Sequence, residues 1–173
     1  MANILVTGAS GMLGQHLLSK LERSGHTIHS PNRQEVDLAD AEGTLNYLKN
    51  IEIDLVVHCA AYVSGIASSN ETKHYSFDTN VTMGLNLLRA CISQGIARMI
   101  NVGSATVYPN DAPQPLEEHS IGQGAFEQHI EGYALSKYVV YRACEMANEQ
   151  HGASFKTILP CNLFGPYDNF SLE

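Results

Sequence analysis

The 173-residue sequence has little of several features that mark particular classes of protein. Basic residues are few, because ten Lys and Arg stand against eighteen Asp and Glu, for a net charge of −8. Nucleic-acid-binding proteins need positive charge to neutralise phosphates, so this balance argues against one. No apolar run is long enough to span a membrane, and the N-terminal run reaches glycine too soon for a signal peptide. We therefore expect a cytoplasmic protein that partners neither nucleic acid nor a membrane.

Metal-binding patterns are also missing. The four cysteines show no Cys-x-x-Cys spacing, so neither disulfides nor a cysteine metal site are expected, and reduced thiols fit the cytoplasm. The eight histidines are scattered. His26 and His29 are close, but in a strand they would point to opposite faces. We expect no metal site.

Three glycines near the N-terminus form the clearest motif that is present. Residues 4–6 are an apolar run typical of a buried parallel strand. Gly8, Gly11 and Gly14 follow, and leucines over residues 13–21 then recur at helical spacing. In such a turn, the first glycine allows the bend, the second lets a pyrophosphate approach and the third lets the helix pack on its strand. The helix N-terminus then binds phosphate, so we predict a dinucleotide site; an ordinary Gly-rich turn is the alternative.

The remaining sequence alternates between strand and helix patterns. Further strands are expected over residues 26–30, 54–61, 97–102 and 154–159, with helices around 45–48, 77–91 and 133–150. Asp37 and Leu38 are expected to end a short edge strand beside an adenine, and 110–131 to form a surface loop near the site. This alternation predicts a doubly wound α/β fold with a parallel sheet, in one domain over residues 1–171. Leu172-Glu173 resembles a cloning scar.

The end of the second expected strand carries no acidic residue. An acid near this point binds the ribose 2′-hydroxyl in sites that prefer NAD. Here the first acid is Glu35, and Arg33 stands before it. A guanidinium can pair with a 2′-phosphate, which favours NADP over NAD, although Arg33 as a solvated loop residue remains the alternative.

Tyr133 and Lys137 are four residues apart and would share one face of a helix. A phenol titrates near pH 10, and we expect the nearby ammonium to lower the Tyr133 pKa. Ser104 follows an expected strand end, where α/β proteins bind ligands, and could hydrogen-bond a substrate oxygen. His58, by contrast, lies before a strand end and is expected to be a packing residue. A tyrosine and a lysine at this spacing are often only two exposed residues on a helix. The prediction of a catalytic site therefore rests on the ordered set of glycine turn, serine, tyrosine and lysine.

Residues 7–14, Ser104 and the Tyr133–Lys137 segment resemble the nucleotide-sugar branch of the extended short-chain dehydrogenase/reductase family. Residues 58–66, 103–109 and 160–170 resemble more narrowly the GDP-L-fucose synthase family, whose members epimerise and reduce GDP-4-keto-6-deoxymannose with NADPH. The resemblance implies a Rossmann fold, NADP as cofactor, a nucleotide-sugar substrate and a homodimer.

Site residues are likewise implied by this resemblance. The catalytic residues would be Ser104, Tyr133 and Lys137. The cofactor would be bound by Gly8, Ser10, Gly11, Met12, Leu13, Gly14, Arg33, Asp37, Leu38, Ala60, Ala61, Tyr133, Lys137 and Pro160. The substrate would be bound by Ser104, Ala105, Thr106 and Asn162.

The sequence also departs from the family pattern. The family uses a cysteine for epimerisation where this chain has Thr106, and its partner histidine would lie beyond residue 170. The substrate-binding C-terminal domain is not in this sequence, so we expect the stretch to bind nucleotide but to turn over little substrate. Reduction is therefore supported and epimerisation is not. Another NAD(P)-dependent nucleotide-sugar epimerase or dehydratase, or a non-catalytic NADP-binding module, remains an alternative.

Overall fold

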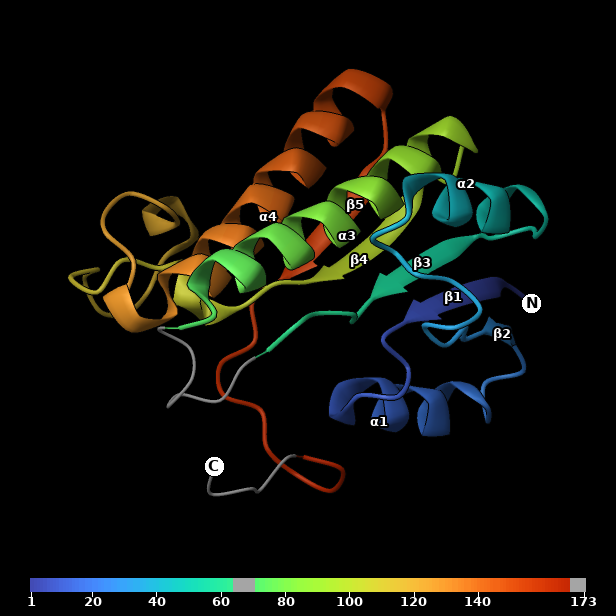
Figure 1. The fold of residues 1–173 in the computed structure, drawn as a ribbon, viewed down its shortest axis with the longest axis horizontal. Helices are drawn as coiled ribbons and strands as arrows, with labels where there is room; N and C mark the ends of the chain where they lie inside the picture. The colour runs from blue at the N-terminus through green and yellow to red at the C-terminus, as the bar shows by residue number, and fades with distance from the viewer. Residues whose placement is uncertain (64–70, 169–173) are drawn as a thin grey trace.

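A parallel sheet runs through the centre of the molecule (Figure 1). The computed structural model describes residues 1–63 and 71–168. Within these residues the strands are β1 (Asn3–Thr7), β2 (Thr27–His29), β3 (Leu55–His58), β4 (Arg98–Val102) and β5 (Ser154–Ile158). They are ordered β2-β1-β3-β4-β5 and all pair in parallel. The order reverses beside β1, so the carboxyl ends of β1 and β3 border the crevice in which this fold class binds ligands.

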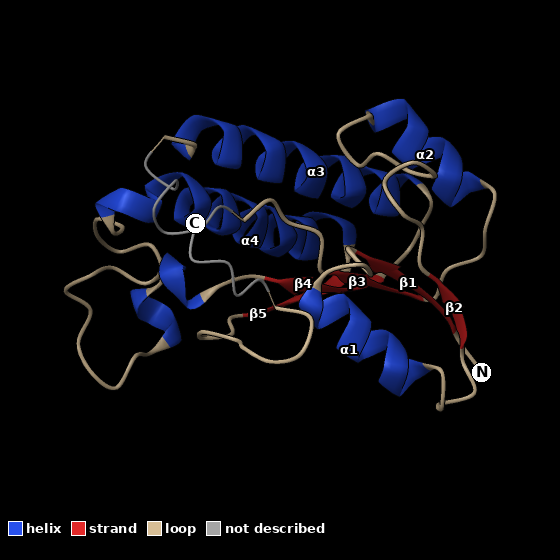
Figure 2. Ribbon diagram, turned by 60° about the horizontal axis from the view of Figure 1, so that its bottom comes forward, coloured by secondary structure: helices blue, strands red, loops and turns tan. Residues whose placement is uncertain are grey.

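Helices cover the two faces of the sheet unequally (Figure 2). One face carries α2 (Ala41–Lys49), α3 (Lys73–Ser93) and α4 (Glu131–His151), and the other carries α1 (Met12–Leu21). The strand residues alternate accordingly: Leu5 belongs to the larger apolar cluster, whereas Ile4 and Val6 pack with the leucines of α1. Burial on both sides explains why β1 is a continuous apolar run.

Most of the predicted elements are confirmed, with shifted ends. The doubly wound α/β architecture is present, and each predicted strand except the edge strand is found. The predicted surface loop at 110–131 contains two short 3₁₀ turns, η2 (Glu118–Ser120) and η3 (Gln128–Ile130), and a third, η1 (Ala105–Val107), precedes it. Residues 64–66 and 169–170, used above for the resemblance, and the Leu172-Glu173 pair lie outside the described residues.

The predicted edge strand ending at Asp37 and Leu38 is wrong. Side chains there satisfy neighbouring backbone donors: the Asn32 amide oxygen accepts from the Gln34 N–H at 2.8 Å, and the Asp37 carboxylate accepts from the Ala39 N–H at 3.0 Å. Such local bonds compete with strand pairing and favour turns. Leu38 is nevertheless 8% exposed, so the segment still packs against the core.

Within the described residues, no helix combines the length and apolar character needed to cross a membrane.

Candidate functional site

The glycine turn joins β1 to α1, and two of its glycines are required by contacts within the chain. Gly8 has φ +68°, and a Cβ there would lie 2.5 Å from the Ala60 nitrogen. A Cβ on Gly14 would lie 2.3 Å from the Gly8 carbonyl oxygen. Both distances are shorter than side chains tolerate, so any larger residue would force the turn away from β3 or the helix away from its strand.

Gly11 differs from its two neighbours. Its φ is −75°, and a Cβ would meet only the Gly8 carbonyl oxygen, at 3.4 Å, which is ordinary contact. The chain itself therefore does not require glycine at this position. Gly11 is the N-cap of α1 and borders a cavity. A glycine here leaves room for a group such as a pyrophosphate to approach the helix N-terminus from this cavity.

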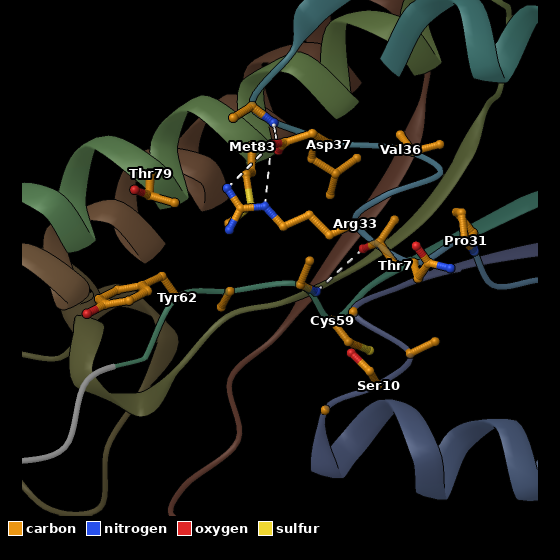
Figure 3. A pocket seen from close by; sticks show the side chains of 18 of the residues that line it. Thr7, Ser10, Pro31, Arg33, Val36, Asp37, Cys59, Tyr62, Thr79 and Met83 are labelled. Atoms are coloured by element: carbon orange, nitrogen blue, oxygen red, sulfur yellow. Dashed lines mark hydrogen bonds and ion pairs between the residues drawn. The ribbon is translucent and has the colours of Figure 1, made fainter. Parts of the chain in front are cut away.

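This cavity of about 320 Å³ lies at the carboxyl ends of β1 and β3. Figure 3 shows its walls, which come from the glycine turn, the 31–39 segment, the exit of β3 and one side of α3. The predicted cofactor residues that line it are Gly8, Ser10, Gly11, Arg33, Asp37, Leu38, Ala60 and Ala61. Met12, Leu13 and Gly14 instead form the first turn of α1.

Arg33 stands at the rim of the cavity (Figure 3). Its guanidinium Nε and Nη2 both lie 3.4 Å from Oδ2 of Asp37. The side chains are 77% and 41% exposed, and an ion pair this exposed is worth about 0–1 kcal/mol. Arg33 can therefore turn from Asp37 to a phosphate at little cost.

Several cavity residues were missed by the sequence reasoning. Tyr62 and Cys59 follow β3, and Thr79 and Met83 lie on α3. Thr79 and Met83 are four residues apart and thus share a helix face, but nothing in that spacing distinguishes a ligand site from the core. For Cys59 and Tyr62 a signal was present, since they flank the Ala60-Ala61 pair.

Ser104, Tyr133 and Lys137 come together near the end of β4, although they are distant in sequence. Ser104 follows β4 and caps η1, while Tyr133 and Lys137 lie on the first turns of α4. The Lys137 ammonium is 5.6 Å from the centre of the Tyr133 ring. The Ser104 hydroxyl hydrogen-bonds Tyr133 and favours a lower pKa for its phenol.

Lys137 is held inside the protein by the backbone of β4. Its side chain is 6% exposed, and Nζ donates to the Val102 carbonyl at 2.8 Å. Burial disfavours the charged form and lowers the pKa of Lys137 to about 8, with Cys59 acting in the opposite direction. A lysine this buried is uncommon unless it has a task.

The predicted lowering of the Tyr133 pKa by Lys137 is wrong for this structure. Burial raises the pKa of Tyr133 above its usual value, and the opposing influence is the Ser104 hydrogen bond. The physical reason is geometric. The Lys137 ammonium donates to Val102 and lies by the ring rather than forming a hydrogen bond to the phenol oxygen.

His58 is a packing residue, as predicted. It is 4% exposed, and its Nδ1 lies 2.8 Å from Oγ1 of Thr7. Thr7 Oγ1 also accepts from the Ala60 N–H at 3.4 Å. Burial, followed by the nearby charge of Lys137, lowers the pKa of His58 to about 3, so the imidazole is neutral and ties the turn to β3.

The remaining predicted residues lie at the exits of β4 and β5. The Ala105 N–H donates to the Pro160 carbonyl at 3.0 Å, which brings the two exits together. Thr106 contacts Ser104, and Asn162 is exposed. Pro160 and Asn162 lie outside the lining of the cavity, so their cofactor and substrate roles stay predictions.

Comparisons with known proteins agree with this geometry. The chain is 35% identical over 168 residues to GDP-L-colitose synthase of Yersinia pseudotuberculosis and 37% identical over 168 residues to GDP-L-fucose synthase of Azorhizobium caulinodans. Each alignment covers 96% of this chain and 54% of the relative. The chain therefore spans about half the length of the curated relatives it matches.

Solved structures show the same fold. GDP-mannoheptose C4 reductase from Campylobacter jejuni with NADP bound matches with a TM-score of 0.92 at 25% identity, over 97% of this chain and 54% of that one. A GDP-L-fucose synthetase from Naegleria fowleri bound to NADP matches with a TM-score of 0.88 at 29% identity, over 99% and 57%. The predicted Rossmann fold and the resemblance to the extended short-chain dehydrogenase/reductase family are thus confirmed. Since the model of the NAD dependent epimerase/dehydratase family matches residues 4–173, the chain belongs to that family.

Proposed function

We propose that residues 1–171 are the cofactor-binding domain of an NADP-dependent nucleotide-sugar reductase that acts on a 4-keto GDP-sugar. The observation that carries the proposal is the cluster of Ser104, Tyr133 and Lys137 in a chain that also has the glycine turn and its cavity. Cys59 connects the two, because it lines the cavity and is near enough to Lys137 to affect the pKa of that lysine. A non-catalytic NADP-binding module would need the turn but not the buried Lys137. The relatives named above, which are GDP-sugar synthases and a GDP-sugar reductase, support the substrate class.

Different residues of the cavity would bind different parts of NADP. The turn around Gly11 and the N-terminus of α1 would bind the pyrophosphate. Arg33 would pair with the 2′-phosphate, and apolar Leu38 and Met83 in the lining would border the adenine. When bound, NADPH supplies a hydride to the carbonyl carbon of the sugar.

The three clustered side chains would handle the oxygen of the same ketone. Tyr133 remains protonated at neutral pH, because burial raises its pKa, and it would give its proton to the oxygen as the C–O double bond is reduced to an alcohol. Ser104 would donate a hydrogen bond to that oxygen. Lys137 has three donors and uses one on Val102, which leaves others for the nicotinamide ribose.

Reduction without epimerisation fits this chain better than both together. Epimerisation needs an acid/base to move a carbon-bound proton. The corresponding position is Thr106, whose hydroxyl does not titrate in the physiological range.

A homodimer and a cytoplasmic location complete the proposal. α4 exposes Leu135 by 37% and Met146 by 48%, and a second copy would cover such apolar side chains. The four cysteines are free thiols, which suits a reducing compartment. Light scattering of the full-length protein would test the dimer, and a monomer at micromolar concentration would contradict it.

The direct test is oxidation of NADPH by the full-length protein in the presence of GDP-4-keto-6-deoxymannose or a 4-keto GDP-heptose. Tyr133→Phe should cut kcat by about 10²–10⁴, the scale of a lost general acid, and leave NADPH affinity unchanged. Ser104→Ala should lower kcat alone, and Lys137→Ala should weaken both. No oxidation with either sugar would overturn the proposed function. A Tyr133→Phe enzyme with wild-type kcat would overturn the acid role.

A further inference from the structure

A buried asparagine on α3 holds one wall of the cavity. Asn86 is 7% exposed, and its Nδ2 donates to the Leu38 carbonyl at 3.0 Å and to the Ala39 carbonyl at 3.1 Å. Leu38 and Ala39 both line the cavity, and both lie in a turn rather than in a strand whose neighbour would supply such donors. An amide nitrogen carries two hydrogens, so this one side chain satisfies two consecutive carbonyls of the wall.

The other bonds of this turn are mostly local. The Asp37 carboxylate accepts from the Ala39 N–H at 3.0 Å, and the Asp37 carbonyl accepts from the Asp40 N–H at 2.9 Å. A longer bond of 3.4 Å joins the Thr44 hydroxyl on α2 to the same carbonyl. The local bonds set the shape of the turn, whereas Asn86 ties it to α3.

α3 forms a second wall of the same cavity. Met83 lines the cavity from this helix (Figure 3). Asn86 is three residues further along and therefore lies on the same side of α3. The contact of Asn86 with Leu38 and Ala39 thus sets the separation between two walls of the cavity, although Asn86 itself lies outside the lining.

We propose that Asn86 is a positioning residue for the cofactor, which keeps Leu38 at the distance from Met83 that the adenine ring of NADP requires. The inference deepens the proposed function and rests on it, because it concerns the binding of the NADPH that the reaction consumes. Side chains behind a site hold the residues that contact the ligand in a productive geometry. Asn86 has this role for the adenosine half of NADP and touches no reacting atom.

A second asparagine provides a matched control. Asn148 on α4 is half-buried, and its amide binds the backbone of Phe155 on β5 through two hydrogen bonds, of 2.7 and 2.8 Å. Both residues lie outside the lining of the cavity. Replacing Asn148 by leucine therefore removes a comparable pair of bonds between a helix and a neighbouring segment without moving a wall of the cavity.

The experiment compares wild type, Asn86→Leu and Asn148→Leu as full-length proteins. Leucine keeps the branched shape of asparagine and removes both hydrogens. In Asn86→Leu, calorimetry should show an affinity about tenfold lower, equivalent to about 1.4 kcal/mol, for NADPH, NADH and adenosine 2′,5′-bisphosphate, because all three contain the adenosine. With the 4-keto GDP-sugar, KM for NADPH should rise by the same factor and kcat should stay unchanged. Asn148→Leu should bind all three ligands as wild type does.

The inference is overturned if Asn86→Leu binds NADPH and adenosine 2′,5′-bisphosphate as tightly as wild type, or if Asn148→Leu loses as much affinity. A fall in kcat with an unchanged KM for NADPH would also overturn it. Asn86→Ala, whose smaller side chain lets the turn relax, replaces Asn86→Leu if that variant does not fold, and failure of both to fold would show that the contact serves the fold instead. If wild type binds NADPH but reduces neither sugar, the proposed reduction fails, and the calorimetry alone decides the role of Asn86.

Discussion

Replacing Lys137 with methionine should make the folded chain more stable while removing a group that the proposed reaction needs. Lys137 is 6% exposed, and burial lowers its pKa from 10.5 to about 8. A lowered pKa in a base means that the unfolded chain binds the proton more tightly than the folded chain does. The buried ammonium therefore lowers the free energy of unfolding by its full amount below about pH 8, and this loss of stability decreases as the pH rises toward 10.5.

The size of the effect follows from the same two values. Each pKa unit corresponds to about 1.4 kcal/mol, so the shift amounts to about 3 kcal/mol below pH 8. Methionine is unbranched and can follow the path of the lysine stem. The Val102 carbonyl loses its Nζ donor, which costs about 1 kcal/mol. We expect Lys137→Met to gain about 2 kcal/mol at pH 7.

Urea unfolding at pH 7, 9 and 10.5 would measure the gap between variant and wild type. It should be largest at pH 7 and shrink by about 3 kcal/mol toward pH 10.5. Lys156→Met, on the exposed side of β5, is the control and should show no such pH dependence. A gap that is constant with pH, or a Lys137→Met chain less stable than wild type at pH 7, would refute the reasoning.

Three further predictions concern stability and cofactor binding. Burial lowers the His58 pKa to about 3, so the neutral imidazole contributes to stability above about pH 6.5, and this contribution is lost as the pH falls toward 3. Between pH 7 and 5, the unfolding free energy of wild type should therefore fall by about 2 kcal/mol more than that of His58→Gln. Urea unfolding measures this, with exposed His74→Gln as the control, and equal losses in wild type and His58→Gln would contradict it. Gly14→Ala should unfold or strongly destabilise the chain, since its Cβ would lie 2.3 Å from the Gly8 oxygen. Gly11→Ala should fold normally but bind NADPH less tightly. If calorimetry shows that Gly11→Ala binds NADPH as tightly as wild type, the pyrophosphate does not bind at this turn. Arg33→Ala should lose about 1–3 kcal/mol of NADPH affinity and little NADH affinity, and an equal loss for both cofactors would exclude a 2′-phosphate contact.

Local patterns were sufficient to predict the order of strands and helices and the glycine turn that joins β1 to α1. Leu5 and its neighbours form an apolar run, and the glycine spacing that follows is a local pattern, although the contact that excludes a side chain at Gly8 comes from distant Ala60. The four-residue spacing of Tyr133 and Lys137 likewise places both on one helix face without reference to the rest of the chain. These features depend on backbone geometry and periodicity, which neighbouring residues determine.

Tertiary structure alone decided how the candidate site is built and charged. Asp37 and Leu38 lie in turns rather than a strand, because nearby side chains satisfy the backbone donors. The cavity needs the exit of β3 and the side of α3 next to the glycine turn. Lys137 donates to Val102, and burial rather than its charge governs the Tyr133 pKa. Burial and hydrogen-bond partners come from residues distant in sequence, so no local pattern could reveal them.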